Sequence, residues 1–130
     1  MANRRYRSQF LYSMVGMRVT VDAQINFAAA GAPTIATGSS LISSVVRNSA
    51  GDYTITFKDV YKSLLGIKHT FNSGNAAPTA PGMYIKNDSI AVLAAPTIRV
   101  VFNAAGTATD PASGEKVLLN FYLNNSTVTW

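Results

Sequence analysis

Residues 18–27, RVTVDAQINF, alternate between polar and apolar side chains without a break. A period of two places successive side chains on opposite faces of an extended chain, so it predicts a strand with one buried and one solvated face. The side chains expected on the buried face are Val19, Val21, Ala23, Ile25 and Phe27. This segment indicates a half-buried sheet, the building unit of antiparallel β proteins.

The same period recurs farther along the chain, in residues 53–57, 67–71 and 98–102. Near the C-terminus, Val117, Leu119, Phe121 and Leu123 form one apolar face. Leu118 and Tyr122 add apolar side chains to the other face of the same segment. We therefore predict a strand covered on both sides, either at the centre of the sheet or at a subunit contact.

Turn-forming residues separate these segments, since Gly and Pro let the chain reverse direction at low cost. They fall in residues 30–33, 48–52, 72–75, 81–82 and 110–114. Strands at this spacing predict an all-β fold, an antiparallel β-sandwich or jelly roll. We expect long surface loops at residues 28–40 and 72–81. One short helical turn is predicted at Asp59 to Leu65, where the apolar spacing is close to helical.

The length of 130 residues fits one domain. Charged residues make up 13% of the chain, about half the usual share. A surface so poor in charge is typical either of a small β protein coated with Ser, Thr and Asn or of one partly covered by other subunits. Both interpretations remain open at this stage.

Basic charge is concentrated at the N-terminus, where Arg4, Arg5 and Arg7 supply three of the eleven Lys and Arg residues. Without them, eight basic residues face six acidic ones. Like charges repel along a chain and cannot be buried together, so we predict an extended basic arm, used for attachment or left as a disordered tail. We divide the chain into residues 1–17, an N-terminal arm and first strand, and residues 18–130, a single β-sandwich domain.

Candidate catalytic residues are few. The one histidine, His69, alternates with Ile67 and Phe71 on the expected inward face, where a structural role is more common than a catalytic one. The acids are scattered singly, and Asp52 and Asp110 fall in turn segments, where Asp commonly bonds to backbone. With no cysteine and no phosphate-binding loop, we expect no enzyme activity, no metal and no cofactor.

The basic charge of the chain raises nucleic acid as a partner. A pI of about 9.8 and the run Arg4, Arg5, Tyr6, Arg7 are features that phosphates attract. The rest of the chain has no second basic cluster or stacking stripe, so nucleic acid is not the expected partner. No apolar run approaches the ~20 residues of a membrane-spanning helix, so no membrane association is expected.

Two stretches, residues 48–67 and 96–126, resemble small virion proteins of tailed bacteriophages. In these proteins G-x-Y-T-I-T opens a strand, D-x-Y-x-x-L-L follows, and L-x-N-S ends the chain. The matching residues here begin at Gly51, Asp59 and Leu123. The resemblance covers about residues 45 to 126, and its motifs are structural rather than catalytic.

The resemblance implies a decoration, or cement, protein: a homotrimeric β-sandwich or jelly roll that clamps neighbouring major capsid proteins. Such a protein is made in the host cytoplasm and ends on the outer surface of the phage head in the virion. Some relatives are head fibres or tail parts, so the alternative is a carbohydrate-binding or receptor-binding module. Tyr84, expected in a loop after residues 81–82, is the one aromatic platform for that role. No residue role carries over.

Two sets of contact residues follow from side-chain chemistry, because Arg and aromatic residues are common interface anchors. The proposed capsid-binding set is Arg4, Arg5, Tyr6, Arg7, Phe10 and Tyr12. The proposed oligomer interface is Leu118, Tyr122 and Trp130. Exposing a side chain as large as Trp130 forfeits its burial energy, so we expect it to pack against a neighbouring subunit or within its own.

Overall fold

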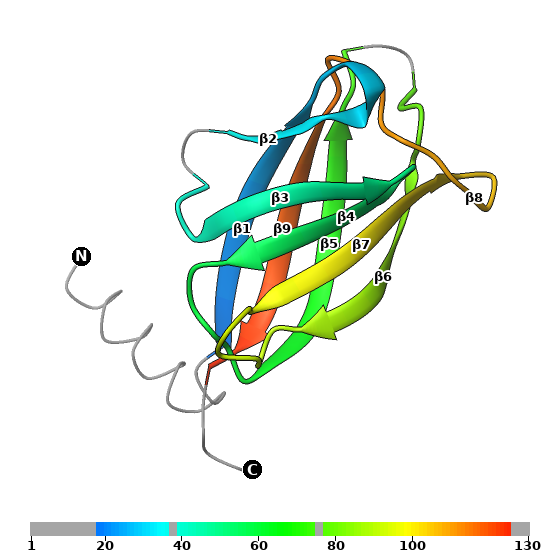
Figure 1. Cartoon of the computed structure of the whole chain (residues 1–130). Helices are drawn as coiled ribbons and strands as arrows, with labels where there is room; N and C mark the ends of the chain where they lie inside the picture. Colours follow the sequence, from blue (N-terminus) through cyan, green and yellow to red (C-terminus); the bar gives the residue numbers. More distant parts are fainter. Residues whose placement is uncertain (1–17, 37–38, 75–76, 126–130) are drawn as a thin grey trace.

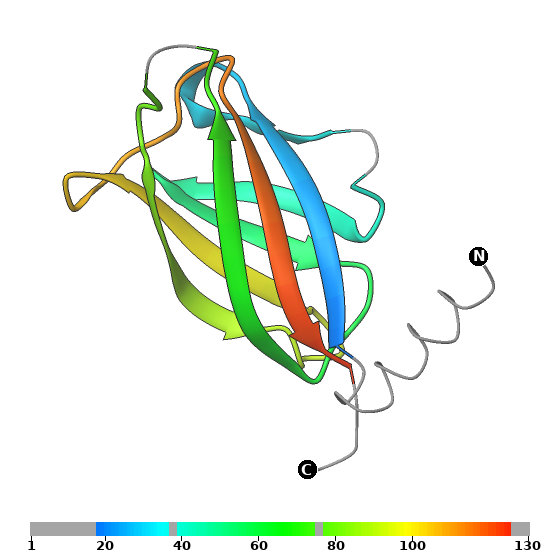
Figure 2. The same cartoon turned by 180° about the vertical axis from the view of Figure 1, so that it is seen from behind.

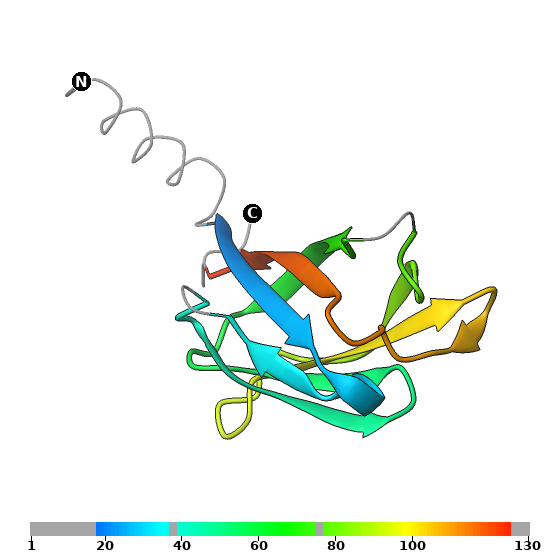
Figure 3. The same cartoon turned by 90° about the horizontal axis from the view of Figure 1, so that it is seen from above.

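The computed structural model describes residues 18–36, 39–74 and 77–125. Two antiparallel sheets face each other, as Figure 1 and the view from above in Figure 3 show. The β9 sheet has the order β2 (Pro33–Ile35), β1 (Arg18–Phe27), β9 (Lys116–Asn124), β5 (Ser63–Asn72). The β7 sheet has the order β3 (Ile42–Ser49), β4 (Asp52–Phe57), β7 (Thr97–Ala104), β6 (Gly82–Ser89), and β8 (Thr107–Ala108) pairs with β7. The predicted all-β sandwich is confirmed.

Strands distant in sequence pair across the whole length of the sandwich. The first strand, β1, pairs with the last, β9, from Arg18 opposite Asn124 to Asn26 opposite Lys116. In the second sheet, β4 pairs with β7 in the same nested manner. Nested pairing of this kind is also found in jelly rolls. It brings both ends of the described domain to one end of the β9 sheet.

The core lies between the sheets and is built from the alternating segments. Val21, Ala23, Ile25 and Phe27 of β1 are buried, as the sequence pattern predicts. At its centre, the rings of Phe27, Tyr53 and Phe102 meet edge to face with centroids 5.4–5.8 Å apart. Such aromatic pairs stabilise a core beyond the area they bury.

The strand β9 lies between β1 and β5, at the centre of the sheet, which is one of its two predicted positions, but in the described residues only one of its faces is covered (Figure 2). Its inward side chains, Val117, Leu119, Phe121 and Leu123, are fully buried. Leu118 and Tyr122 point the other way and are each 42% exposed.

The predicted helical turn at residues 59–65 is wrong. The strand β5 begins there at Ser63, and Leu64 pairs with Leu123. A register shift between Leu64 and Gly66 interrupts the period of two. Leu64 and Leu65 are adjacent, so the apolar residues of this segment do not alternate with polar ones and resemble helical spacing. The short helical turn is instead η1 (Ala29–Gly31), and in the described residues no helix is long and apolar enough to cross a membrane.

The expected loops are partly strand. Residues 28–40 contain η1 and β2, whereas residues 72–81 do connect β5 to β6. Tyr84 lies in β6 rather than in a loop. The strands β3 and β6 are edge strands with register shifts, at Ile42/Ser44 and Arg47/Ser49 in β3 and at Ile85/Asn87 in β6. These irregularities remove the alternation by which a strand is recognised in sequence.

Candidate interaction surface

The strands β1, β9 and β5 lie side by side in the β9 sheet (Figure 2), and side chains from all three form rows on its outer face. Each row takes one residue from each strand, because the pairing register places them opposite one another. The rows are Thr20, Tyr122, Gly66; Asp22, Asn120, Lys68; Gln24, Leu118, Thr70; and Asn26, Lys116, Asn72. This face therefore carries apolar, amide and charged groups in a regular grid.

Apolar side chains on this face are only half covered. Leu118 and Tyr122 are each 42% exposed, and Leu65, which lines the same hollow as Tyr122, is 51% exposed. Solvated apolar groups gathered on one face indicate a contact surface, because their burial releases about 25 cal/mol per Å². The predicted interface residues Leu118 and Tyr122 thus share one open face.

Two hollows flank Asn120 on this face. One, of about 430 Å³, is lined by Arg18, Val19, Thr20, Leu65 and Tyr122. The other, of about 220 Å³, is lined by Gln24, Thr70, Asn72, Lys116 and Leu118. The first combines Val19, Leu65 and Tyr122 with polar neighbours and the second combines Leu118 with polar neighbours, a mixture that is typical of protein contacts.

The charges on this face are asymmetric. Asp22 is exposed and accepts a hydrogen bond from the Nδ2 of Asn120 at 2.6 Å. Lys68 lies on the far side of Asn120 in the same row. Arg18 and Lys116 lie toward the two ends. Three basic residues thus accompany one acid.

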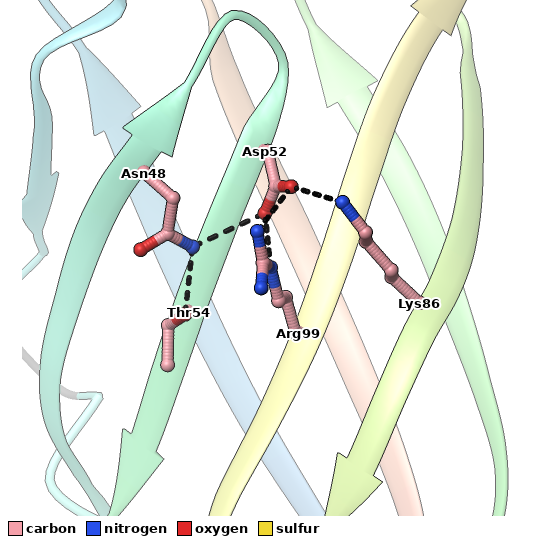
Figure 4. Close-up of polar contacts among 5 residues, drawn as sticks. All are labelled: Asn48, Asp52, Thr54, Lys86 and Arg99. Atoms are coloured by element: carbon pink, nitrogen blue, oxygen red, sulfur yellow. Dashed lines mark hydrogen bonds and ion pairs between the residues drawn. The ribbon is translucent and has the colours of Figure 1, made fainter.

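A second polar cluster lies on the outer face of the β7 sheet (Figure 4). The carboxylate of Asp52, only 3% exposed, accepts bonds from Nε and a terminal nitrogen of Arg99 at 2.7 and 2.8 Å. Lys86 Nζ lies 2.9 Å from the same carboxylate, and Asn48 donates to it at 3.1 Å. These donors, Arg99 first, hold the pKa of Asp52 well below its usual range despite its burial. The cluster joins β3, β4, β7 and β6, so it fixes the sheet.

A third cluster closes one end of the sandwich. Asp110 accepts two bonds from Arg47, at 3.0 and 2.8 Å, and one from the Gly51 amide at 2.8 Å. The Tyr53 hydroxyl lies 3.0 Å from Asp110 and 2.7 Å from the Gly31 carbonyl. The bond to Arg47 is the main reason that the pKa of Asp110 is lowered, while burial raises the pKa of Tyr53.

The buried carboxylate of Glu115 connects two loops through hydrogen bonds. Its Oε1 accepts from the amide and hydroxyl of Thr79 at 2.8 and 2.9 Å, and its Oε2 accepts from the Ala112 amide at 3.2 Å. Together with Asp52 and Asp110, it has its carboxylate oxygens occupied by donors of this chain. These three acids therefore hold neighbouring strands and loops of the chain together.

The structure describes some of the residues singled out from the sequence and leaves others outside the described ranges. Arg4, Arg5, Tyr6, Arg7, Phe10, Tyr12 and Trp130 lie outside the described residues. His69 is half-buried, as predicted: its Nε2 lies 3.0 Å from the Pro81 carbonyl oxygen, and its ring packs edge to face on Phe71. Asp52 differs from its predicted turn role, since its carboxylate is bound by Arg99 and Lys86 of other strands.

Among the described residues, no three metal-binding side chains come together. Comparison of the chain with family models, with characterised proteins and with solved structures gives no match. The outer face of the β9 sheet is therefore judged on its own chemistry.

Proposed function

We propose that this protein is a structural virion protein, a capsid decoration or cement protein. It binds the outer surface of a phage head as a homotrimer and stabilises the contacts between major capsid proteins. The observation that carries the proposal is the open outer face of the β9 sheet, where Leu65, Leu118 and Tyr122 are 51%, 42% and 42% exposed. The resemblance of residues 45 to 126 to small phage virion proteins agrees with it.

The framework suits a load-bearing role. Ion pairs and hydrogen bonds tie all four long strands of the β7 sheet at Asp52, and the core rings interlock between the sheets. A trimer that engages three equivalent capsid positions gains avidity through effective concentration, so each single contact can be weak. A rigid scaffold with modest contacts is therefore sufficient for capsid attachment.

The basic arm is the proposed attachment device. Arg4, Arg5 and Arg7 pair with acidic groups of the major capsid protein, while Tyr6, Phe10 and Tyr12 fill shallow apolar pockets. Guanidinium groups bind carboxylates in a bidentate manner, which makes Arg a better anchor than Lys here.

Co-sedimentation with capsid shells assembled without this chain tests the proposal. The full chain is compared with a variant lacking residues 2–8, and circular dichroism checks that both are folded. We expect saturable binding of the full chain and much weaker binding of the shortened one. Failure of the full chain to sediment with shells would refute capsid attachment, and equal binding of the two would refute the role of the arm.

A head-fibre or tail-associated module that binds carbohydrate or a receptor is the second candidate. Tyr84, 53% exposed on the edge strand β6, favours it, because an exposed aromatic face can stack on a sugar ring. Binding on a glycan array that Tyr84→Ala abolishes would support this candidate over the first.

A further inference from the structure

Asp22 and Lys68 occupy opposite sides of one row on the outer face of the β9 sheet. Both pair in register with Asn120 of the central strand, Asp22 from β1 and Lys68 from β5. Both are exposed. The two outer strands of this face therefore carry opposite charges at the same height.

These two charges form no ion pair with each other in the structure. Neighbouring strands lie about 4.8 Å apart, so β1 and β5 are separated by about 10 Å. The carboxylate of Asp22 is held toward Asn120 by the 2.6 Å hydrogen bond, and Lys68 forms no ion pair with any other described residue. Each charge is thus available to a neighbouring molecule.

We propose that three copies of this chain pack the outer faces of their β9 sheets around a threefold axis. The strand β9 of each copy lies innermost, and Asp22 of each copy pairs with Lys68 of the next. The arrangement rests on the homotrimer of the proposed function and identifies the surface that forms it. A contact of this kind is head to tail, and it closes into a ring when the rotation between copies is 120°.

The apolar side chains of β9 fill the centre of this arrangement. Leu118 and Tyr122 are four residues apart, about 13 Å along the strand, so they form two layers on the axis. Asn120 lies between the layers, and its Nδ2 donates a hydrogen bond to Oδ1 of Asp22. Leu65 lines the same hollow as Tyr122 and adds to that layer.

The width of the face agrees with three copies. If about 10 Å separates the outer strands of a face and about 10 Å separates it from the next, each β9 lies about 6 Å from a threefold axis. Leu and Tyr side chains can span that distance. Four copies would place β9 about 10 Å from the axis and leave the centre open.

The charge pattern also selects one direction of packing. When β1 of one copy adjoins β5 of the next, Asp22 faces Lys68 at every boundary. When β1 adjoins β1, two Asp22 carboxylates face each other and the contact is disfavoured. The charges therefore disfavour every contact in which β1 adjoins β1.

Charge reversal tests the arrangement in free protein, without capsid. Asp22→Lys and Lys68→Asp are prepared singly and together, and the mass of each is measured by light scattering at low salt. Lys58→Asp is the matched control, because Lys58 is an exposed lysine outside this face. Circular dichroism confirms that every variant is folded.

We expect the original chain and the control to have three times the 13.8 kDa of the monomer. Each single reversal should weaken association about 100-fold or more, since it places like charges at every boundary. The double reversal should restore the trimer. A monomeric or dimeric original chain, or single variants that remain trimeric, or a double variant that fails to recover, would overturn the arrangement.

These outcomes are separate from those of capsid binding. If the single reversals weaken the trimer and the double reversal restores it, but the chain does not sediment with capsid shells, the proposed function alone is refuted. A chain that binds shells as a monomer would refute the threefold arrangement alone.

Discussion

The substitution Asp52→Asn removes the charge at the centre of the β7 sheet cluster. The side chain of Asp52 is 4% accessible. Its carboxylate contacts Arg99 and Lys86, whose side chains are 38% and 49% accessible. Hydrogen bonds to a charged group contribute about 1.5–3 kcal/mol each, and breaking a buried pair costs about 3–5 kcal/mol. Because both cations can be hydrated after the change, and because Asn keeps one acceptor oxygen, we expect a loss of about 2 kcal/mol.

Urea unfolding at pH 7, followed by circular dichroism at fixed protein concentration, measures this loss. Guanidinium is avoided because it is a salt that screens ion pairs. The midpoint should fall by about 1 M urea. Asp59→Asn, which removes an exposed carboxylate, serves as the control and should change the unfolding free energy by less than about 0.5 kcal/mol.

The pH dependence gives a second check on the same reasoning. The unfolded carboxyl titrates near pH 4, and the folded pKa of Asp52 is lower, so the folded state binds fewer protons in between. The contribution of Asp52 is therefore complete above about pH 5 and is lost as the pH falls. The difference between the original chain and Asp52→Asn should shrink in acid. Equal stabilities at pH 7, or a difference that does not change with pH, would refute this account.

Three further predictions concern other parts of the chain. Gly31→Ala should lower the unfolding free energy by about 3 kcal/mol, because φ at Gly31 is +68° and an added Cβ would lie 2.5 Å from the Asp110 Cγ. The control, Gly74→Ala, has a similar φ of +69° but open space around it, so it should lower the unfolding free energy by only about 1 kcal/mol. Equal losses in urea unfolding would exclude the close contact as the cause. Leu118→Asn combined with Tyr122→Asn should yield a folded monomer by light scattering, and retention of the trimer would contradict the interface. Trp130, the one tryptophan, should emit at shorter wavelength than a free indole in buffer, and an emission equal to that of the free indole would show that it is solvated.

The regular part of the fold was predictable because its strands bury one face. In β1, in residues 53–57 of β4 and in β9 burial alternates along the strand, so the sequence alone predicts the inward side chains, whereas in β7 Val101 is buried between Val100 and Phe102. The apolar side chains on both faces of β9 predict cover on both faces, whereas pairing with β1 and β5 leaves the outer face open in the described residues. Edge strands lack this signal, because register shifts in β3, β5 and β6 interrupt the period of two. The sequence therefore predicts a helical turn at residues 59–65, where β5 begins.

The polar clusters could not be predicted, because they depend on pairings between distant residues. Arg99 and Asp52 are 47 positions apart, and Lys86 and Asp52 are 34 apart. Only the register of β4, β7 and β6 brings them together. The same holds for Asp22 and Lys68, which face one another across Asn120 only because β1 and β5 both pair with β9. Leu118 and Tyr122 each lie two residues from Asn120 in the same strand, so the sequence alone predicts that they share one face.

The number of copies bound per capsid at saturation tests the central proposal most directly. Capsid shells assembled without this chain are titrated with it, and bound copies are counted after sedimentation. The account predicts a plateau at a fixed multiple of three copies per shell. Binding that never saturates, a plateau that is not a multiple of three, or no binding at all would contradict a trimeric decoration protein.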